Sequence, residues 1–100
     1  MTFANVGRLG AQPGRRDELL SILTRPNAEL AGAGCLLYEV GVADDDPDAV
    51  HVLELWTSAE AHAASLALPS VRAAIAEAMA LLSGEMSGAR FRVAGSPLRG

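Results

Sequence analysis

The feature that most constrains this fold is a pair of apolar β-type segments, 35–42 and 49–56, separated by an acidic turn. The turn, Asp44-Asp45-Asp46-Pro47-Asp48, consists of residues that favour loops and do not easily continue a strand. The sequence therefore predicts a β-hairpin with a loop longer than two residues. Both segments carry apolar residues on both faces, whereas a sheet with one wet face alternates apolar and polar residues. Both faces of the hairpin therefore need cover.

The chain itself can cover only one of these faces. A sequence of 100 residues is one domain, and its helices form a single layer. Aromatic residues make up 4% of the sequence, so aliphatic side chains must fill the core and leave room for a second subunit. We therefore expect a homodimer formed through the sheet face.

The remaining segments supply partners for the hairpin. The run 3–11 reads as a strand that ends before Pro13-Gly14, and a helix follows with a kink or break at Pro26. Ser58 or Thr57 is placed to cap the next helix. That helix covers 59–66, is broken at Pro69, and resumes from 70 to 82.

The last strand is expected at 89–94, after a linker of small residues, with Phe91 and Val93 inward and Arg90 and Arg92 outward. The order is then β-α-β-β-α-β with a split second helix. This order predicts an α+β, ferredoxin-like fold. We place the domain at 1–95 and a loose tail at 96–100.

Composition excludes several functional classes. The net charge of −4 argues against nucleic acid as a partner, and the single Cys35 excludes an intramolecular disulfide and a Cys-based zinc site. His51 and His62 lack a third ligand at metal spacing, so we expect no metal site. No apolar run is long enough to span a bilayer, so we expect no membrane partner and a cytoplasmic location.

A few polar side chains fall on apolar faces, where they could carry chemistry. Glu54 and Trp56 share a strand face; such a carboxylate either pairs with a base, for which Arg8 is available, or works in a cavity. Asn5 lies on the face of an apolar strand, either satisfied near its end or pointing into a cavity. His62 lies beside the inward stripe of its helix, where imidazole suits proton transfer. A buried structural histidine is the alternative.

The sequence resembles the antibiotic biosynthesis monooxygenase family over nearly its whole length, to about residue 93. The resemblance rests on four segments in the family's order: Pro13-Gly14-Arg15-Arg16-Asp17-Glu18-Leu19-Leu20, Gly34-Cys35-Leu36-Leu37-Tyr38-Glu39, Glu54-Leu55-Trp56 and Leu66-Ala67-Leu68-Pro69. It implies a dimeric α+β barrel of two ferredoxin-like sheets packed face to face. It also implies that some members oxidise quinols or polyketide aromatics with O₂, using neither metal nor flavin.

The chain departs from the family pattern at several positions. Many members carry histidines where this sequence has Ser65 and Ser70. The haem-degrading branch relies on an Asn, a Trp and a His, and the aligned positions here are Gly7, Ser65 and Ile75. We therefore do not expect haem degradation.

The resulting hypothesis is a cofactor-independent monooxygenase that oxidises a small phenolic, quinol or polyketide-like aromatic. The expected catalytic residues are His62 and Glu54, and we expect His62 at a helix end outside the packed core. The expected substrate-binding residues are Asn5, Tyr38, Trp56 and Ser65. The alternatives are a non-catalytic module that binds a small ligand on the same fold, and an isomerase or lyase that uses only acid–base groups.

Overall fold

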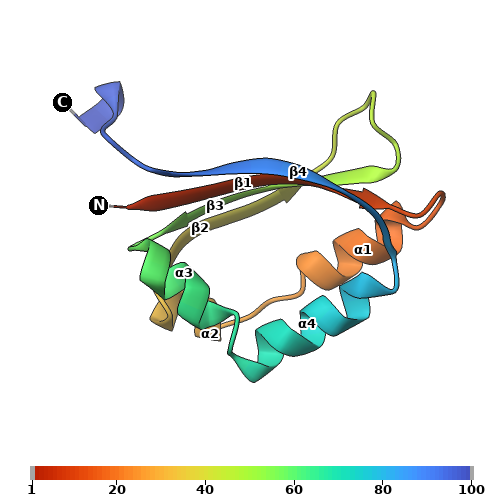
Figure 1. Cartoon of the computed structure of the whole chain (residues 1–100), viewed down its shortest axis with the longest axis horizontal. Helices are drawn as coiled ribbons and strands as arrows, with labels where there is room; N and C mark the ends of the chain where they lie inside the picture. Colours follow the sequence, from red (N-terminus) through yellow and green to blue (C-terminus); the bar gives the residue numbers. More distant parts are fainter. Residues whose placement is uncertain (1, 100) are drawn as a thin grey trace.

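The computed structural model describes residues 2–99 and shows one antiparallel sheet covered on one side by helices (Figure 1). The elements are β1 (Phe3–Ala11), α1 (Arg16–Leu23), α2 (Glu29–Gly32), β2 (Cys35–Gly41), β3 (Ala49–Trp56), α3 (Ala59–Ser65), α4 (Pro69–Met79), β4 (Leu82–Arg92) and a 3₁₀ helix, η1 (Pro97–Arg99). The strand order is β2-β3-β1-β4. The chain thus has the predicted ferredoxin-like α+β fold.

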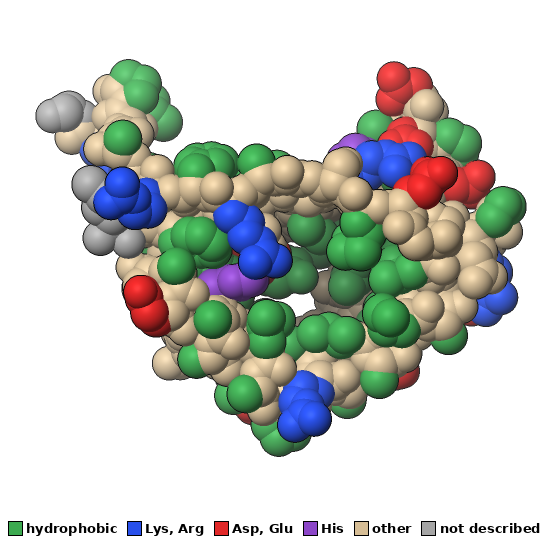
Figure 2. Space-filling model, in the orientation of Figure 1, with side chains coloured by type: hydrophobic (Ala, Val, Ile, Leu, Met, Phe, Trp, Pro, Cys, Tyr) green, Lys and Arg blue, Asp and Glu red, His purple; other side chains and the backbone are tan. Residues whose placement is uncertain are grey.

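The strand register decides which side chains face the helices. In β1 and β3, Leu9 lies opposite Val50 and Asn5 lies opposite Glu54. Val50 packs with Leu19 of α1, so this side of the sheet faces the helices. Because side chains alternate along a strand, Asn5 and Glu54 point to the same side. Figure 2 shows a hollow between the sheet and the helical layer.

The predicted helix breaks are confirmed. α1 ends at Leu23, before Pro26, and α2 starts at Glu29. Pro69 separates α3 from α4 and occupies the first turn of α4, where its missing N–H costs least. Ser58 caps α3, because its hydroxyl accepts a hydrogen bond from the Ala61 backbone N–H at 3.0 Å.

The predicted end of the chain is wrong in two respects. α4 ends at Met79 and β4 already starts at Leu82, so Leu82, expected in the helix, and the expected linker belong to a long strand. β4 pairs with β1 along the whole length of β1. This pairing uses backbone hydrogen bonds, so small residues can take part in it. The faces are also reversed: Arg90 lies opposite Asn5 and faces the helical side, whereas Phe91 lies opposite Ala4 on the other side. Alternation alone could not tell which side was inward.

One end of the helix-covered face is tightly filled. This cluster, here called the aliphatic end, contains Ala11, Leu19, Val50, Ala78 and Leu81. Leu19 and Val50 are fully buried. α4 packs against α1 at this end, so the two helices close the core together.

The opposite side of the sheet is open and apolar. Val6, Leu53 and Phe91 are 37%, 44% and 50% exposed on three neighbouring strands. None of the α-helices within residues 2–99 covers this side (Figure 1), as the doubly apolar hairpin predicted. Within residues 2–99, no helix combines the length and apolar character needed to cross a membrane.

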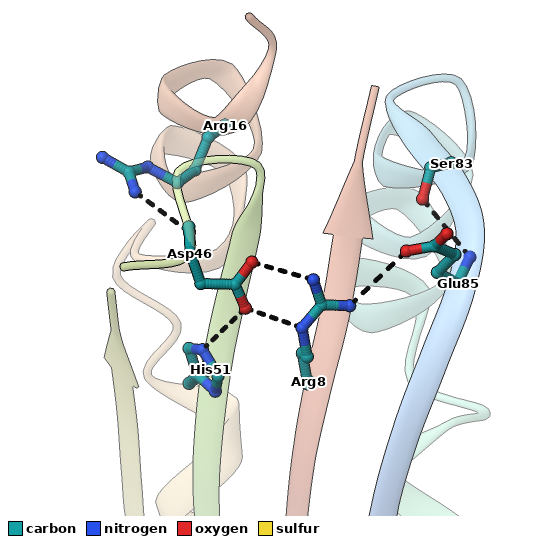
Figure 3. A network of polar contacts seen from close by, with 6 residues as sticks. All are labelled: Arg8, Arg16, Asp46, His51, Ser83 and Glu85. Atoms are coloured by element: carbon teal, nitrogen blue, oxygen red, sulfur yellow. Dashed lines mark hydrogen bonds and ion pairs between the residues drawn. The ribbon is translucent and has the colours of Figure 1, made fainter. Parts of the chain in front are cut away.

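A charged network lies at one end of this open side (Figure 3). Arg8 donates to both carboxylate oxygens of Asp46, at 2.7 and 2.9 Å, and lies 3.8 Å from Glu85. Arg8, the base that the sequence left available to Glu54, does not pair with it, because the two side chains point to opposite faces of the sheet. The hydrogen bonds from Arg8 lower the pKa of Asp46, aided by the charges of Arg8 and His51.

Candidate functional site

A cavity of about 610 Å³ lies against the helix-facing side of the sheet. Its polar lining includes Asn5, Tyr38, Glu54 and Arg90, which come from all four strands. Its apolar lining includes Leu9, Val52 and Met86, and its floor includes Gly7 and Gly88. A mostly apolar cavity with a few convergent polar groups is the usual form of a small-molecule site.

Glu54 is the buried carboxyl group of this cavity. It is 6% exposed and accepts two hydrogen bonds, from Asn5 Nδ2 to Oε2 at 2.7 Å and from Trp56 Nε1 to Oε1 at 3.0 Å. The two donors come from β1 and from β3 itself, so the carboxyl group is fixed by the sheet. A carboxylate oxygen has two lone pairs, and one on each oxygen remains available to a further donor.

His62 lies behind Glu54 and not at the cavity wall. Its Nε2 is 3.9 Å from Glu54 Oε1, and its ring packs 5.5 Å from Phe3 and 5.4 Å from Trp56. It is 7% exposed, so the expectation that it lies outside the packed core is wrong. The short loop between Trp56 and α3 brings the helix down onto the end of β3.

Ser65 is held by the backbone of α3. Its hydroxyl donates to the carbonyl oxygen of His62 at 2.6 Å, and its side chain is buried. It does not line the cavity described above. Its substrate-binding role stays a prediction.

Tyr38 enters the cavity from β2, opposite Glu54 in the ladder. Burial raises the pKa of its phenol to about 12, and the nearby charges of Glu54 and Cys35 add to the shift. Tyr38 therefore stays a neutral hydroxyl at physiological pH and can donate or accept a hydrogen bond. It is not placed to act as a base.

Arg90 is the lining residue that sequence analysis missed. It is exposed, and its side chain makes no hydrogen bond or ion pair with any residue in 2–99, so its charge is available at the cavity. Its strand alternates cleanly, but alternation does not show which of the two faces turns toward the helices. The pairing of Arg90 with Asn5 shows that the face of Arg90 is the inner one.

The structure brings together most of the predicted residues. Asn5, Tyr38 and Glu54 line the cavity, whereas Trp56 and His62 support Glu54 from behind. In the part of the chain that the structure describes, no three His, Cys, Asp or Glu side chains are grouped as metal ligands. The arrangement offers a fixed carboxyl acceptor, a neutral hydroxyl and a cation around an apolar space.

Comparison with known proteins identifies related structures. A protein from Chloroflexus aurantiacus J-10-fl, classed with the antibiotic biosynthesis monooxygenases, is 37% identical, with a TM-score of 0.83 over 96% of each chain. A protein of Caulobacter crescentus CB15 is 21% identical, with a TM-score of 0.77 over 94% of this chain and 91% of its own, and shows the shared fold alone.

The family itself is shown by the sequence. The comparison with functionally curated proteins finds no match. The family model described as antibiotic biosynthesis monooxygenase matches residues 2–77, which include β1 to β3, α3 and most of α4. This range contains Asn5, Tyr38 and Glu54, three of the polar residues at the cavity. The chain belongs to the antibiotic biosynthesis monooxygenase family.

Proposed function

We propose that this protein is a cofactor-independent monooxygenase that acts on a small phenolic, quinol or polyketide-like aromatic. The observation that carries the proposal is the Glu54 carboxyl group, held by Asn5 and Trp56 in the wall of an apolar cavity. Arg90 supplies a positive charge at the same cavity. The family name and the related structures support an oxygenase over other reactions on this fold.

The reaction can be balanced without an added reductant. A phenol with a free para C–H reacts with O₂ to give the para-quinone and water, so the substrate supplies all the electrons. The protein must accept the phenol proton and keep the resulting anion in a dry site, because the phenolate is the species that reduces O₂.

The site residues fit these tasks. In this proposal Glu54 accepts the phenol proton, and His62, 3.9 Å from Glu54, stabilises or receives it. Burial and the Glu54 charge, which raise the pKa of Tyr38, would also oppose ionisation of a bound phenol. Proton transfer to Glu54 neutralises that charge, and Arg90 attracts the phenolate.

Oxygen uptake with a panel of phenols and hydroquinones tests this proposal. Glu54→Gln should lower turnover by roughly 10²–10⁴-fold, the usual share of an acid–base group. Both native hydrogen bonds can survive in this variant, because a flipped Asn5 amide accepts from the new NH₂ while Trp56 donates to its oxygen. Glu60→Gln, at an exposed position in α3, is the matched control. Wild-type turnover in Glu54→Gln would refute the role of Glu54.

The alternative functions give different results in the same assay. A ligand-binding module would show no oxygen uptake with any substrate, while a ligand would still raise the melting temperature. An isomerase or lyase would convert its substrate without consuming oxygen. The buried carboxyl group and Arg90 favour the oxygenase, since a carrier does not require a proton acceptor.

We also propose that the chain forms a homodimer through the open side of the sheet. The exposed Val6, Leu53 and Phe91 support this, because a contiguous apolar surface on neighbouring strands normally marks an interface. Such a pair should bury well above ~1,000 Å² in total.

Sedimentation of two matched variants tests the dimer. Leu53→Glu places a charge on the open side of the sheet and should give a monomer. Leu66→Glu, at 45% exposure just after α3, introduces the same change away from that side and should leave the dimer intact. A stable monomer for the wild-type chain at micromolar concentration would overturn the proposal.

The domain limits and the cellular location also stay predictions. Val93 donates a backbone hydrogen bond to Thr2 at 2.8 Å, which ties the chain to β1 just beyond β4. η1 follows, with Leu98 almost fully exposed. Removal of 96–100 should leave the melting temperature unchanged if the domain ends at 95. The cytoplasmic location can be checked by cell fractionation.

A further inference from the structure

Gly7 differs from the other glycines near it, because the fold does not require a glycine there. At Gly88 an added Cβ would lie 2.2 Å from the Val6 carbonyl oxygen, and at Gly10 it would lie 2.5 Å from the Ser83 hydroxyl. At Gly7 the added atom would meet only Ser87 and Val52, both at an ordinary contact distance of 3.5 Å. Gly7 also has no positive φ.

A glycine within a strand is destabilising relative to alanine, because it loses more conformational freedom and contributes no packing. Where the backbone conformation does not require glycine, a glycine in a strand often marks a point at which a ligand or another chain approaches the backbone closely. Gly7 lies on the same face of β1 as Asn5 and Leu9, which is the face toward the helices. The close approach is therefore on the cavity side.

Gly7 lies at the centre of the cavity floor. It pairs with Val52 on β3 and with Gly88 on β4, so two adjacent strands present bare backbone at this point. Asn5 and Leu9 flank it along β1. The floor is therefore flat where the walls carry side chains.

We propose that Gly7 is a specificity-determining residue that lets a flat aromatic ring lie directly on the backbone of β1 and β4. This inference deepens the proposed function and rests on the same site. Two residues of strand span roughly 7 Å, so a hydroxyl on a ring above Gly7 reaches the Asn5–Glu54 pair. A puckered ring is thicker and loses contact with this floor.

Calorimetric titration without oxygen, which prevents oxidation, tests the proposal with 2-naphthol and decahydro-2-naphthol. These probes share a carbon skeleton and a hydroxyl group, but only the first is flat. Wild-type protein should bind 2-naphthol at least about tenfold more tightly than the saturated probe. Gly7→Ala should lower the 2-naphthol affinity by at least about tenfold, because its methyl group lifts the ring from the floor.

Gly41→Ala is the matched control. Gly41 also lies in a strand, has no positive φ, and an added Cβ would meet nothing within 4 Å. Both alanine variants should melt at or above the wild-type temperature, and Gly41→Ala should keep the wild-type affinity. A lower melting temperature for Gly7→Ala would show that the fold needs the glycine, which would overturn the inference.

Three binding results would also overturn it: no 2-naphthol binding by the wild type, equal binding of both probes, or unchanged affinity in Gly7→Ala. Oxygen uptake separates this inference from the proposed function. Loss of 2-naphthol affinity in Gly7→Ala with no oxygen uptake on any phenol would leave the inference intact and refute the oxygenase. Normal affinity in Gly7→Ala with a strong Glu54→Gln effect on turnover would do the reverse.

Discussion

The two ends of the helix-covered face are built from the same strands but differ in chemistry. At the aliphatic end, Leu9 and Val50 face Leu19 of α1, and no polar side chain belongs to the cluster. The other end is here called the polar end. There the same face of β1 and β3 carries Asn5 and Glu54. His62 and Trp56 complete this end.

The difference shows how one short domain can combine a stable core with the site proposed to be active. α1 and α4 close the aliphatic end, whereas α3 reaches the polar end separately because the helix is broken before Pro69. The cavity lies on the sheet between the two helical contacts. A filled core would leave no space for the proposed substrate, and an all-polar core would not support the fold.

The largest expected effect on stability is at the aliphatic end. Leu19→Ala should lower the free energy of unfolding by about 2–5 kcal/mol, because it removes a fully buried side chain and leaves a cavity. Denaturant unfolding at fixed protein concentration measures it. Phenol affinity in the folded fraction should be unchanged. A cost below about 1 kcal/mol would show that this end is not the main source of stability.

Substitution at the polar end should affect both stability and activity. His62→Ala should cost about 1–3 kcal/mol, because the ring packs between Phe3 and Trp56 in a buried position. His62→Phe keeps an aromatic ring in this space and should recover most of the stability. It should not recover oxygen uptake, because it has no nitrogen beside Glu54.

If His62→Phe restores oxygen uptake together with stability, His62 acts only through packing. The pH profile of turnover provides a second measurement. If His62 acts only through packing, the profile of His62→Phe should match that of the wild type. The two variants thus decide whether His62 contributes its nitrogen atoms to the reaction or only fills space at the polar end.

The fold could be predicted because its determinants are local. Pro26 and Pro69 interrupt helices wherever they occur, and the acidic run after 42 cannot extend a strand. β4 was less predictable. Its small residues pair with β1 through the backbone, which leaves no pattern in the side chains.

The site was predicted in part for a related reason. Polar residues at apolar positions are visible in the sequence, and this pattern predicts Asn5, Glu54 and His62 as site residues. Arg90 lies on an exposed edge strand, where alternation does not identify the inner face. The partners of Glu54 also depend on register, so the sequence alone does not show that Arg8 lies on the opposite face. Gly7 has no side chain, so no pattern of polar and apolar residues marks it as a site residue.

Tyr38 provides a pH test of the polar end with a smaller expected effect. Its pKa is raised from 10.0 to about 12, so the folded state holds the proton more tightly than the unfolded state. The resulting stability is fully present below pH 10 and is lost as pH rises toward 12. Relative to Tyr38→Phe, the wild type should lose roughly 1–2 kcal/mol over this range.

The chain has a single tyrosine, so the tyrosinate absorption of the folded protein reports this group alone. Titration midway near 10 would show that Tyr38 is not desolvated and that the polar end is wet. No aliphatic-end variant should move this midpoint, because none contacts Tyr38.

The smallest expected effect is at the charged network on the open side of the sheet. Arg8 donates two hydrogen bonds to Asp46, and these lower the pKa of the carboxyl group. A lowered folded-state pKa adds stability above the unfolded value near 3.8, and that stability is lost as pH falls through the folded value. Asp46→Asn should therefore be slightly less stable than the wild type at neutral pH, with a difference that shrinks below about pH 4.

Urea midpoints at neutral and acidic pH measure this difference, with Asp45→Asn in the same loop as the control. Asp45 is exposed, so its substitution should leave the midpoint unchanged at both pH values. Phenol affinity should not change in either variant, because Arg8 holds Asp46 on the side of the sheet opposite Glu54. An affinity change in Asp46→Asn would mean that the two faces of the sheet are coupled, and the comparison would then have to include the dimer interface proposed on the open side.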